Sequence, residues 1–503
     1  MVFKKQRKGV VVPPDNEEHG KSDSKPAMHV IVLGPTGGPC EDRVTGILVR
    51  STATEWRPNS MVAVDAGTLI GGIIHVLEQC EIKDGVITLG PFTGLHVPHK
   101  STRANASYIF RKIVGTVLIT HAHLDHVSAL AMNTPVLGPE SGPKAVAALP
   151  SVVSAMKAHL FNDVIWPNLS DEDGAGLITY QRLVEGGNPM MGSGEVRGYV
   201  RAVDGLLTRC FGVSHGSCKA KAENDHEHFR RASSAIISGD WNRAFTDTPG
   251  PPGTRTSSDS PYPGREPRLT TVDSSTFFIH DQQTGSEIMV FGDVEPDSLS
   301  NFPRNSNVWR VAAPKIVSHQ LRAIFIECSY SDEIEDGYLF GHLCPRHLIA
   351  ELTVLARFVA GLKKDPASGK RKRGSSGLGD STEPTSPKSK RGAVSNSSKR
   401  KSSSKQSPRR SGKGTDETNE MSDSAQPSGS LDPQALDREL RSAKQDIKDS
   451  LSGLAIYIIH IKDDMTDGPP PGERILQELK DRNQEVELGC DFHVPERGES
   501  IFI

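Results

Sequence analysis

The sequence predicts an α/β fold in which strands and helices pack as layers. Short apolar runs rich in β-branched residues recur along the chain, as buried strands require; they include Gly46–Arg50, Ile113–Ile119 and Ala455–Ile461. Longer stretches with helical character separate them, such as Pro143–Leu160 and Arg346–Leu362. Because strands and helices mixed along one chain pack in layers, we expect the α/β class.

We expect one domain with an N-terminal tail and two inserts. Residues 1–27 are polar and charged without a clear period, and the domain is predicted to span residues 28–503. Residues 242–268 are rich in Pro, Gly, Ser and Thr, which indicates a surface loop. Residues 363–430 are rich in serine and basic side chains and contain no aromatic residue. Such a segment buries too little apolar surface to offset its ordering entropy, so we expect it to be disordered.

Charge is unevenly distributed along the 503 residues, whose formal net charge is −3. Residues 363–413 hold 16 Lys and Arg against 3 Asp and Glu, so the rest of the chain is acidic. No apolar run reaches the roughly 18 residues of a membrane span. The basic N-terminal residues precede no apolar segment, so no secretory signal is expected. The seven cysteines show no CxxC spacing, which indicates reduced thiols and not a disulfide framework. We therefore expect a cytoplasmic protein. The basic clusters at 370–373 and 399–401 could direct nuclear import, or they could belong to a merely solvated linker, and the sequence favours neither.

The segment most informative about chemistry is His121-Ala-His123-Leu-Asp125-His126, which directly follows the apolar run Ile113–Ile119. Imidazole and carboxylate are the usual protein ligands of zinc and similar ions. A turn after a strand lets alternate side chains diverge toward two separate ions. The alternative is a polar loop that happens to hold three histidines, but this spacing after a buried strand rarely arises by chance.

The motif resembles the signature of the metallo-β-lactamase fold, in which two mixed sheets lie between helices and two metals bind at one sheet edge. The resemblance implies that His121 and His123 bind one ion and that Asp125 and His126 bind the other. It further implies an ordered set of later ligands, each at the end of an apolar run: His215, the bridging Asp293, and His460. Asp65 matches the first motif of the fold, where a carboxylate orients ligands without binding the metal.

Other interpretations of single residues stay open at this point. Taken alone, His215 is more often an ordinary loop histidine and Asp293 an ordinary turn aspartate. His226 and His228 lie in a charged stretch, and we interpret them as part of a solvated helix and not as ligands.

A finer resemblance is to the class II cyclic-nucleotide phosphodiesterases, typified by the fungal low-affinity cyclic-AMP enzymes. It rests on seven segments, in order, between residues 30 and 462; they include Val290-Phe-Gly-Asp-Val-Glu, Gly341-His-Leu-Cys-Pro-Arg-His-Leu and Ile458-Ile-His-Ile-Lys. The resemblance implies hydrolysis of 3′,5′-cyclic AMP to the 5′-monophosphate, with two divalent metal ions, expected to be zinc. Cyclic GMP remains open as a second substrate, as does the oligomeric state.

Two further residues are assigned by resemblance to the ribonuclease Z branch of the same fold. Glu327 and His342 match its paired glutamate and histidine motifs, which implies that His342 is the general acid and that Glu327 orients it. The alternative is that both are structural polar residues near the site. Asp125 is assigned to catalysis as well as to the metal.

Two other functions compete with cyclic-nucleotide hydrolysis, and the sequence also suggests one regulatory interaction. An RNA 3′-processing nuclease would need a basic face, but the basic segment lacks aromatic residues for base stacking, so no nucleic-acid partner is expected. A non-catalytic nucleotide sensor would not need all seven ligand positions. Arg230-Arg-Ala-Ser233 resembles a site of the cyclic-AMP-dependent protein kinase, which makes Ser233 a candidate phosphorylation site, although such short motifs are common.

Overall fold

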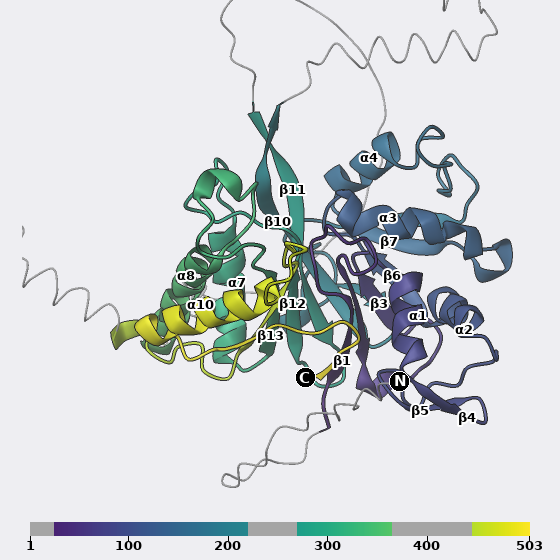
Figure 1. Cartoon of the computed structure of the whole chain (residues 1–503), viewed down its shortest axis with the longest axis horizontal. Helices are drawn as coiled ribbons and strands as arrows, with labels where there is room; N and C mark the ends of the chain where they lie inside the picture. Colours follow the sequence, from purple (N-terminus) through teal and green to yellow (C-terminus); the bar gives the residue numbers. More distant parts are fainter. Residues whose placement is uncertain (1–24, 220–268, 365–444) are drawn as a thin grey trace, which may run out of the picture. The chain divides into compact units, whose positions relative to one another are not determined.

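The computed structural model describes residues 25–219, 269–364 and 445–503. The chain divides into two units, one of residues 1–366 and 443–503 and one of residues 367–442, and the description below concerns the first. Within it lie two seven-stranded mixed sheets (Figure 1). Residues of both sheets contribute to one shared apolar core.

The first sheet combines an antiparallel half with a parallel half. Its strand order is β16-β1-β2-β3-β6-β7-β8, with parallel pairing from β3 to β8. The strands are β1 (Met28–Gly34), β2 (Gly46–Ser51), β3 (Met61–Val64), β6 (Val114–Leu118), β7 (Lys144–Ala148), β8 (Ile178–Arg182) and β16 (Ser500–Phe502). The short pair β4 (Glu81–Lys83) and β5 (Val86–Leu89) forms a separate hairpin.

Four helices lie beside the first sheet, and the last of them also contacts the second sheet (Figure 1). They are α1 (Ile70–Glu78), α2 (Thr102–Tyr108), α3 (Leu124–Asn133) and α4 (Pro150–His159). The helix expected over Pro143–Leu160 is therefore partly wrong, because its first residues form the parallel strand β7. Pro150 occupies the first turn of α4, where its fixed φ and missing N–H suit a helix start.

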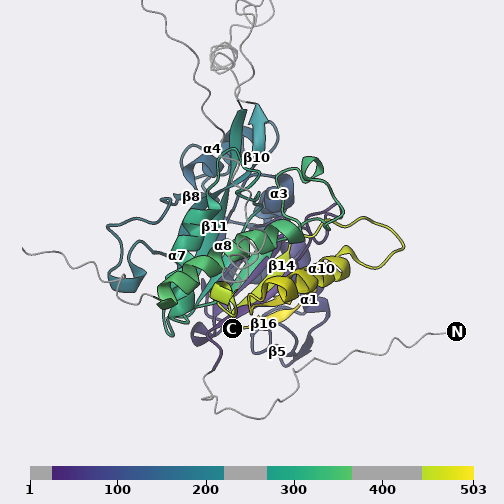
Figure 2. The same cartoon turned by 90° about the vertical axis from the view of Figure 1, so that its left-hand side faces the viewer.

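The second sheet has the order β15-β14-β13-β12-β11-β10-β9, parallel from β12 to β15 and antiparallel elsewhere. Its strands are β9 (Val200–Val203), β10 (Leu206–Lys219), β11 (Leu269–Asp281), β12 (Glu287–Phe291), β13 (Leu321–Glu327), β14 (Ala455–Ile459) and β15 (Asp491–His493). Figure 2 shows α7 (Asn305–Val317), α8 (Pro345–Lys364) and α10 (Pro471–Val486) in front of this sheet.

Alternate residues of the second sheet serve two different cores. Phe277 and Ile279 of β11 pack into the core shared with the first sheet, whereas Phe278 between them packs with residues of α7 and α8. Since successive side chains of a strand point to opposite faces, a strand buried on both sides reads as a continuous apolar run. The predicted α/β class, with two sheets between helices, is confirmed.

Several sequence-based predictions fall on residues that the structure does not describe. Residues 242–268 lie outside the described part, as do residues 365–430 of the second predicted insert and most of the tail 1–27. Within the described residues, no helix is long and apolar enough to cross a membrane.

Candidate metal centre

The predicted ligands come together where parallel strands of both sheets end. Asp65 directly follows β3, and the segment from His121 to His126 follows β6 and leads into α3. Asp293 and His460 follow β12 and β14 of the second sheet. The carboxyl ends of parallel strands meet at one edge of a sheet, so residues far apart in the chain become neighbours there.

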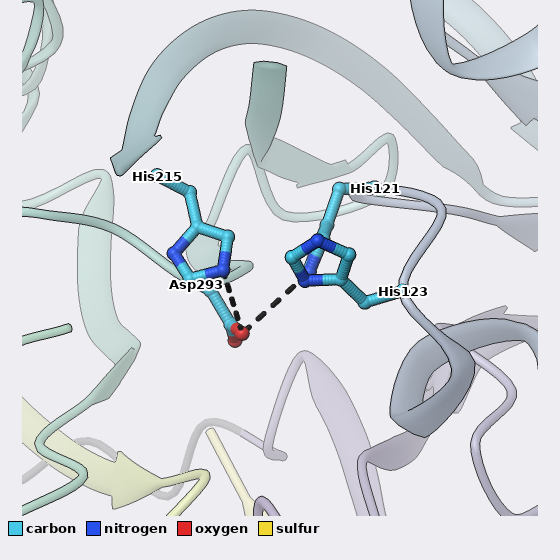
Figure 3. A group of neighbouring side chains, drawn as sticks. All are labelled: His121, His123, His215 and Asp293. Atoms are coloured by element: carbon cyan, nitrogen blue, oxygen red, sulfur yellow. Dashed lines mark ion pairs between the residues drawn. The ribbon is translucent and has the colours of Figure 1, made fainter. Parts of the chain in front are cut away.

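One group of side chains consists of His121, His123, His215 and Asp293, whose ligand atoms lie within 4.8 Å of one another. Figure 3 shows His121 and His215 on either side of the Asp293 carboxylate. Nε2 of His121 lies 3.5 Å and Nε2 of His215 lies 3.6 Å from Oδ2 of Asp293. His215 sits where the β10–β11 register shifts between Ser214 and Ser217, an irregularity that re-aims side chains.

A second group consists of Asp125, His126, Asp293 and His460. Nε2 of His126 and Nε2 of His460 each lie 3.2 Å from Oδ1 of Asp293. Nε2 of His460 is also 3.2 Å from Oδ2 of Asp125. Asp293 therefore belongs to both groups, with one carboxylate oxygen facing each.

The chemistry of these atoms fits bound cations. Nε2 of His121 and Oδ1 of Asp293 are buried and have no hydrogen-bond partner among the described residues. Burial lowers the pKa of His121, and burial with the neighbouring His215 lowers the pKa of His123 to about 4. Both imidazoles are thus neutral at physiological pH and can offer a lone pair. Neutral imidazoles and carboxylates, paired in this way, form a metal site.

His126 lies between two buried carboxylates. Its burial alone would lower its pKa, but Asp293 and Asp65 offset this and raise the pKa well above its ordinary value. The excess of negative charge around one imidazole is what a bound cation would neutralise.

Hydrogen bonds from outside the two groups orient three of the imidazoles. Nδ1 of His126 lies 2.8 Å from Oδ2 of Asp65, and Nδ1 of His215 lies 2.9 Å from the carbonyl of Gly341. Nδ1 of His460 lies 3.1 Å from Oγ of Ser329. When Nδ1 carries the proton, Nε2 keeps its lone pair, and in all three residues Nε2 is the atom that faces a carboxylate of the centre.

Glu327 and His342 form a buried pair beside the centre. Nδ1 of His342 lies 3.0 Å from Oε1 of Glu327, which also accepts from the N–H of Val294. The other oxygen of Glu327 accepts from the hydroxyl of Ser329 and the N–H of Leu343. Burial would lower the pKa of His342, but the Glu327 carboxylate raises it. The residues His215, Glu327 and His342 also form a third group of potential ligands, although the oxygens of Glu327 are already occupied by four donors.

The structure adds residues that the sequence did not single out. A Cβ on Gly37 would lie 2.5 Å from Cε1 of His460, so a glycine at this position permits close contact with the centre. Nζ of Lys462 lies 3.5 Å from Oδ2 of Asp125. Only its place in the segment Ile458-Ile-His-Ile-Lys could have indicated Lys462. Ser233, His226 and His228 lie outside the described residues.

The chain matches the model of the family described as cAMP phosphodiesterases class-II over residues 31–191 and 260–368. It is 28% identical over 328 residues to the 3′,5′-cyclic-nucleotide phosphodiesterase of Schizosaccharomyces pombe, covering 65% of this chain and 75% of that protein. It is 24% identical over 374 residues to the Candida albicans 3′,5′-cyclic-nucleotide phosphodiesterase, covering 65% of this chain and 82% of that protein. The crystal structure of unliganded yeast PDE1 shares the fold, with 18% identity, a TM-score of 0.57, and coverage of 95% of this chain and 100% of that chain.

Proposed function

This chain belongs to the class-II cAMP phosphodiesterases and is a 3′,5′-cyclic-nucleotide phosphodiesterase, and from that premise we propose that it hydrolyses cyclic AMP at a centre of two divalent metal ions, expected to be zinc. The observation that carries the proposal is the position of Asp293, whose two oxygens each face a separate group of histidines. His121, His123 and His215 would hold one ion. Asp125, His126 and His460 would hold the other.

When bound, two cations held by these residues would neutralise charge on the phosphate and lower the pKa of a water. The attacking water releases one proton to solvent, and its oxygen forms a bond to phosphorus while the bond from phosphorus to O3′ breaks, giving the 5′-monophosphate. The alkoxide that leaves needs a proton. His342 lines the cavity at the centre, and its raised pKa favours the protonated form. We therefore assign the proton donation to His342 and the orientation of its ring to Glu327.

The proposal is tested with purified protein assayed on cyclic AMP and cyclic GMP before and after chelation. We expect chelation to remove activity on both substrates and added zinc to restore it. Asp125→Ala should lose most cyclic-AMP hydrolysis and hold fewer than two ions per chain. The matched control is Asp171→Ala, which removes an exposed carboxylate outside both ligand groups. Full activity after complete metal removal would refute the two-metal proposal.

A kinase that responds to cyclic AMP is proposed as a regulatory partner. The support is the sequence Arg230-Arg-Ala-Ser233, since phosphorylation there would add about two negative charges next to two arginines. Treating the protein with that kinase should place phosphate on Ser233 and change turnover, and Ser233→Ala should abolish both effects. If no phosphate is found at Ser233, this partner is excluded.

A further inference from the structure

An exposed aromatic side chain stands at the cavity beside the metal centre. Phe340 is 72% exposed and has a φ of +51°, a left-handed conformation that is unfavourable for a bulky residue. Gly341 follows with a φ of +84°. Apolar exposure and backbone strain in one residue, next to a catalytic centre, indicate a functional constraint.

The turn that carries Phe340 is held on both sides by residues of the centre. The carbonyl of Gly341 lies 2.9 Å from Nδ1 of His215, and the next residue, His342, pairs with Glu327. A Cβ on Gly341 would lie 2.6 Å from the backbone nitrogen of Gly216, so only glycine permits this close approach. Phe340 is therefore placed by the same contacts that orient His215 and His342.

The cavity has two chemically different parts. Its volume is about 490 Å³, within the usual range for small-ligand sites. His123, His215 and His342 line the part at the centre. Phe340 and Leu299, both exposed, line the same cavity and offer apolar surface. A ligand whose anionic group lies at the histidines can thus place a flat apolar group against Phe340.

We propose that Phe340 binds the purine base of the cyclic nucleotide by stacking. This inference rests on the proposed function, because it takes the phosphate to lie at the ligand groups and O3′ to face His342. In a 3′,5′-cyclic nucleotide the ribose is fused to the phosphate ring, so the nucleoside lies on the side to which O3′ departs. Phe340 is two residues from His342 and lines the same cavity.

A second cavity offers a rival position for the base. It has a volume of about 460 Å³ and is lined by apolar residues of α3, α4 and the following loop, including Leu124, Met156 and Ile165, and by His123. His342 is not among its lining residues. A base in this cavity would direct the nucleoside away from the proposed proton donor, which favours the cavity at Phe340.

The experiment compares two substrates that differ only in the base: cyclic AMP and abasic ribose 3′,5′-cyclic phosphate. Because base–aromatic stacking is worth about 1–3 kcal/mol, Phe340→Ala should lower kcat/KM for cyclic AMP about 5- to 150-fold. The abasic substrate should change less than about twofold, since it makes no stacking contact. Phe340→Trp should retain activity on cyclic AMP. Tyr338→Ala is the matched control, because Tyr338 is 63% exposed in the same turn region but does not line the cavity.

Three results would overturn the proposal. Equal losses on both substrates in Phe340→Ala would show that the residue only supports the turn. A base-dependent loss in Ile165→Ala, with none in Phe340→Ala, would place the base in the second cavity. Equal kcat/KM of the unmodified enzyme for the two substrates would exclude any base contact. A failure of the proposed function would be distinguishable from these results. In that case the unmodified enzyme would hydrolyse cyclic AMP equally well with and without metal.

Discussion

Asp65→Asn is expected to weaken metal binding while leaving the fold intact. Asp65 is buried, and Oδ1 accepts a hydrogen bond from the N–H of Thr120 at 2.8 Å, while Oδ2 lies 2.8 Å from Nδ1 of His126. In the variant, an amide nitrogen replaces one of these oxygens. If it faces His126, the proton of that ring moves to Nε2, the atom that must offer a lone pair to the ion. If the amide nitrogen faces Thr120, it meets the backbone N–H of Thr120, and two hydrogen-bond donors then face each other without an acceptor.

The magnitude follows from the indirect role of Asp65. Losing a residue that orients a metal ligand typically lowers metal affinity about 10- to 100-fold, or about 1.4–2.7 kcal/mol. Backbone strain in the variant should lower the stability of the metal-free fold only slightly, because the φ of Asp65 is +57° and asparagine tolerates this left-handed region. We therefore expect a decrease in metal affinity that is much larger than the decrease in the stability of the metal-free fold.

The assay is metal content at buffered free zinc, measured together with thermal unfolding in the presence of a chelator. Asp281→Asn is a matched control, because Asp281 is also buried and accepts from both the N–H and the hydroxyl of a threonine, Thr284, but contacts no histidine of the centre. The reasoning is refuted if Asp65→Asn binds zinc within about twofold of the unmodified protein, or if Asp281→Asn loses as much affinity.

Four further outcomes are expected. Asp293→Ala should abolish most cyclic-AMP hydrolysis and release metal from both groups, and elemental analysis showing two ions retained per chain would contradict the bridging role. His342→Ala should lower turnover of cyclic AMP about 10²- to 10⁴-fold but spare a p-nitrophenyl phosphodiester, whose leaving group needs no proton, so equal losses would indicate a structural role. Gly341→Ala should lower the melting temperature and metal affinity together, because its Cβ meets Gly216 and the displaced carbonyl no longer accepts from His215; an unchanged melting temperature would count against this contact. Deletion of residues 366–428 should leave activity and melting temperature nearly unchanged, since the ligand groups lie elsewhere in the chain, and loss of folding would show that the segment is structural.

The sequence alone was sufficient where the chemistry is local. Four potential ligands lie between His121 and His126, directly after the buried run that forms β6, so their proximity follows from a strand, a turn and a helix start. The α/β class follows in the same way from the periodicity of the strands and helices. The predicted helix over Pro143–Leu160 is wrong for the residues of β7, because a short apolar segment has the same composition in a strand as in a helix.

Tertiary structure was needed where the geometry depends on distant segments. His215 and His460 lie outside the residues that match the family model, and only the pairing of the second sheet brings them to Asp293. The two oxygens of Asp293 face different groups because strands of both sheets end at one place. Phe340 likewise has a left-handed backbone in a turn whose next residue, Gly341, closely approaches the distant Gly216. Side-chain type is encoded residue by residue, whereas direction and distance arise only when segments far apart in the chain pack together.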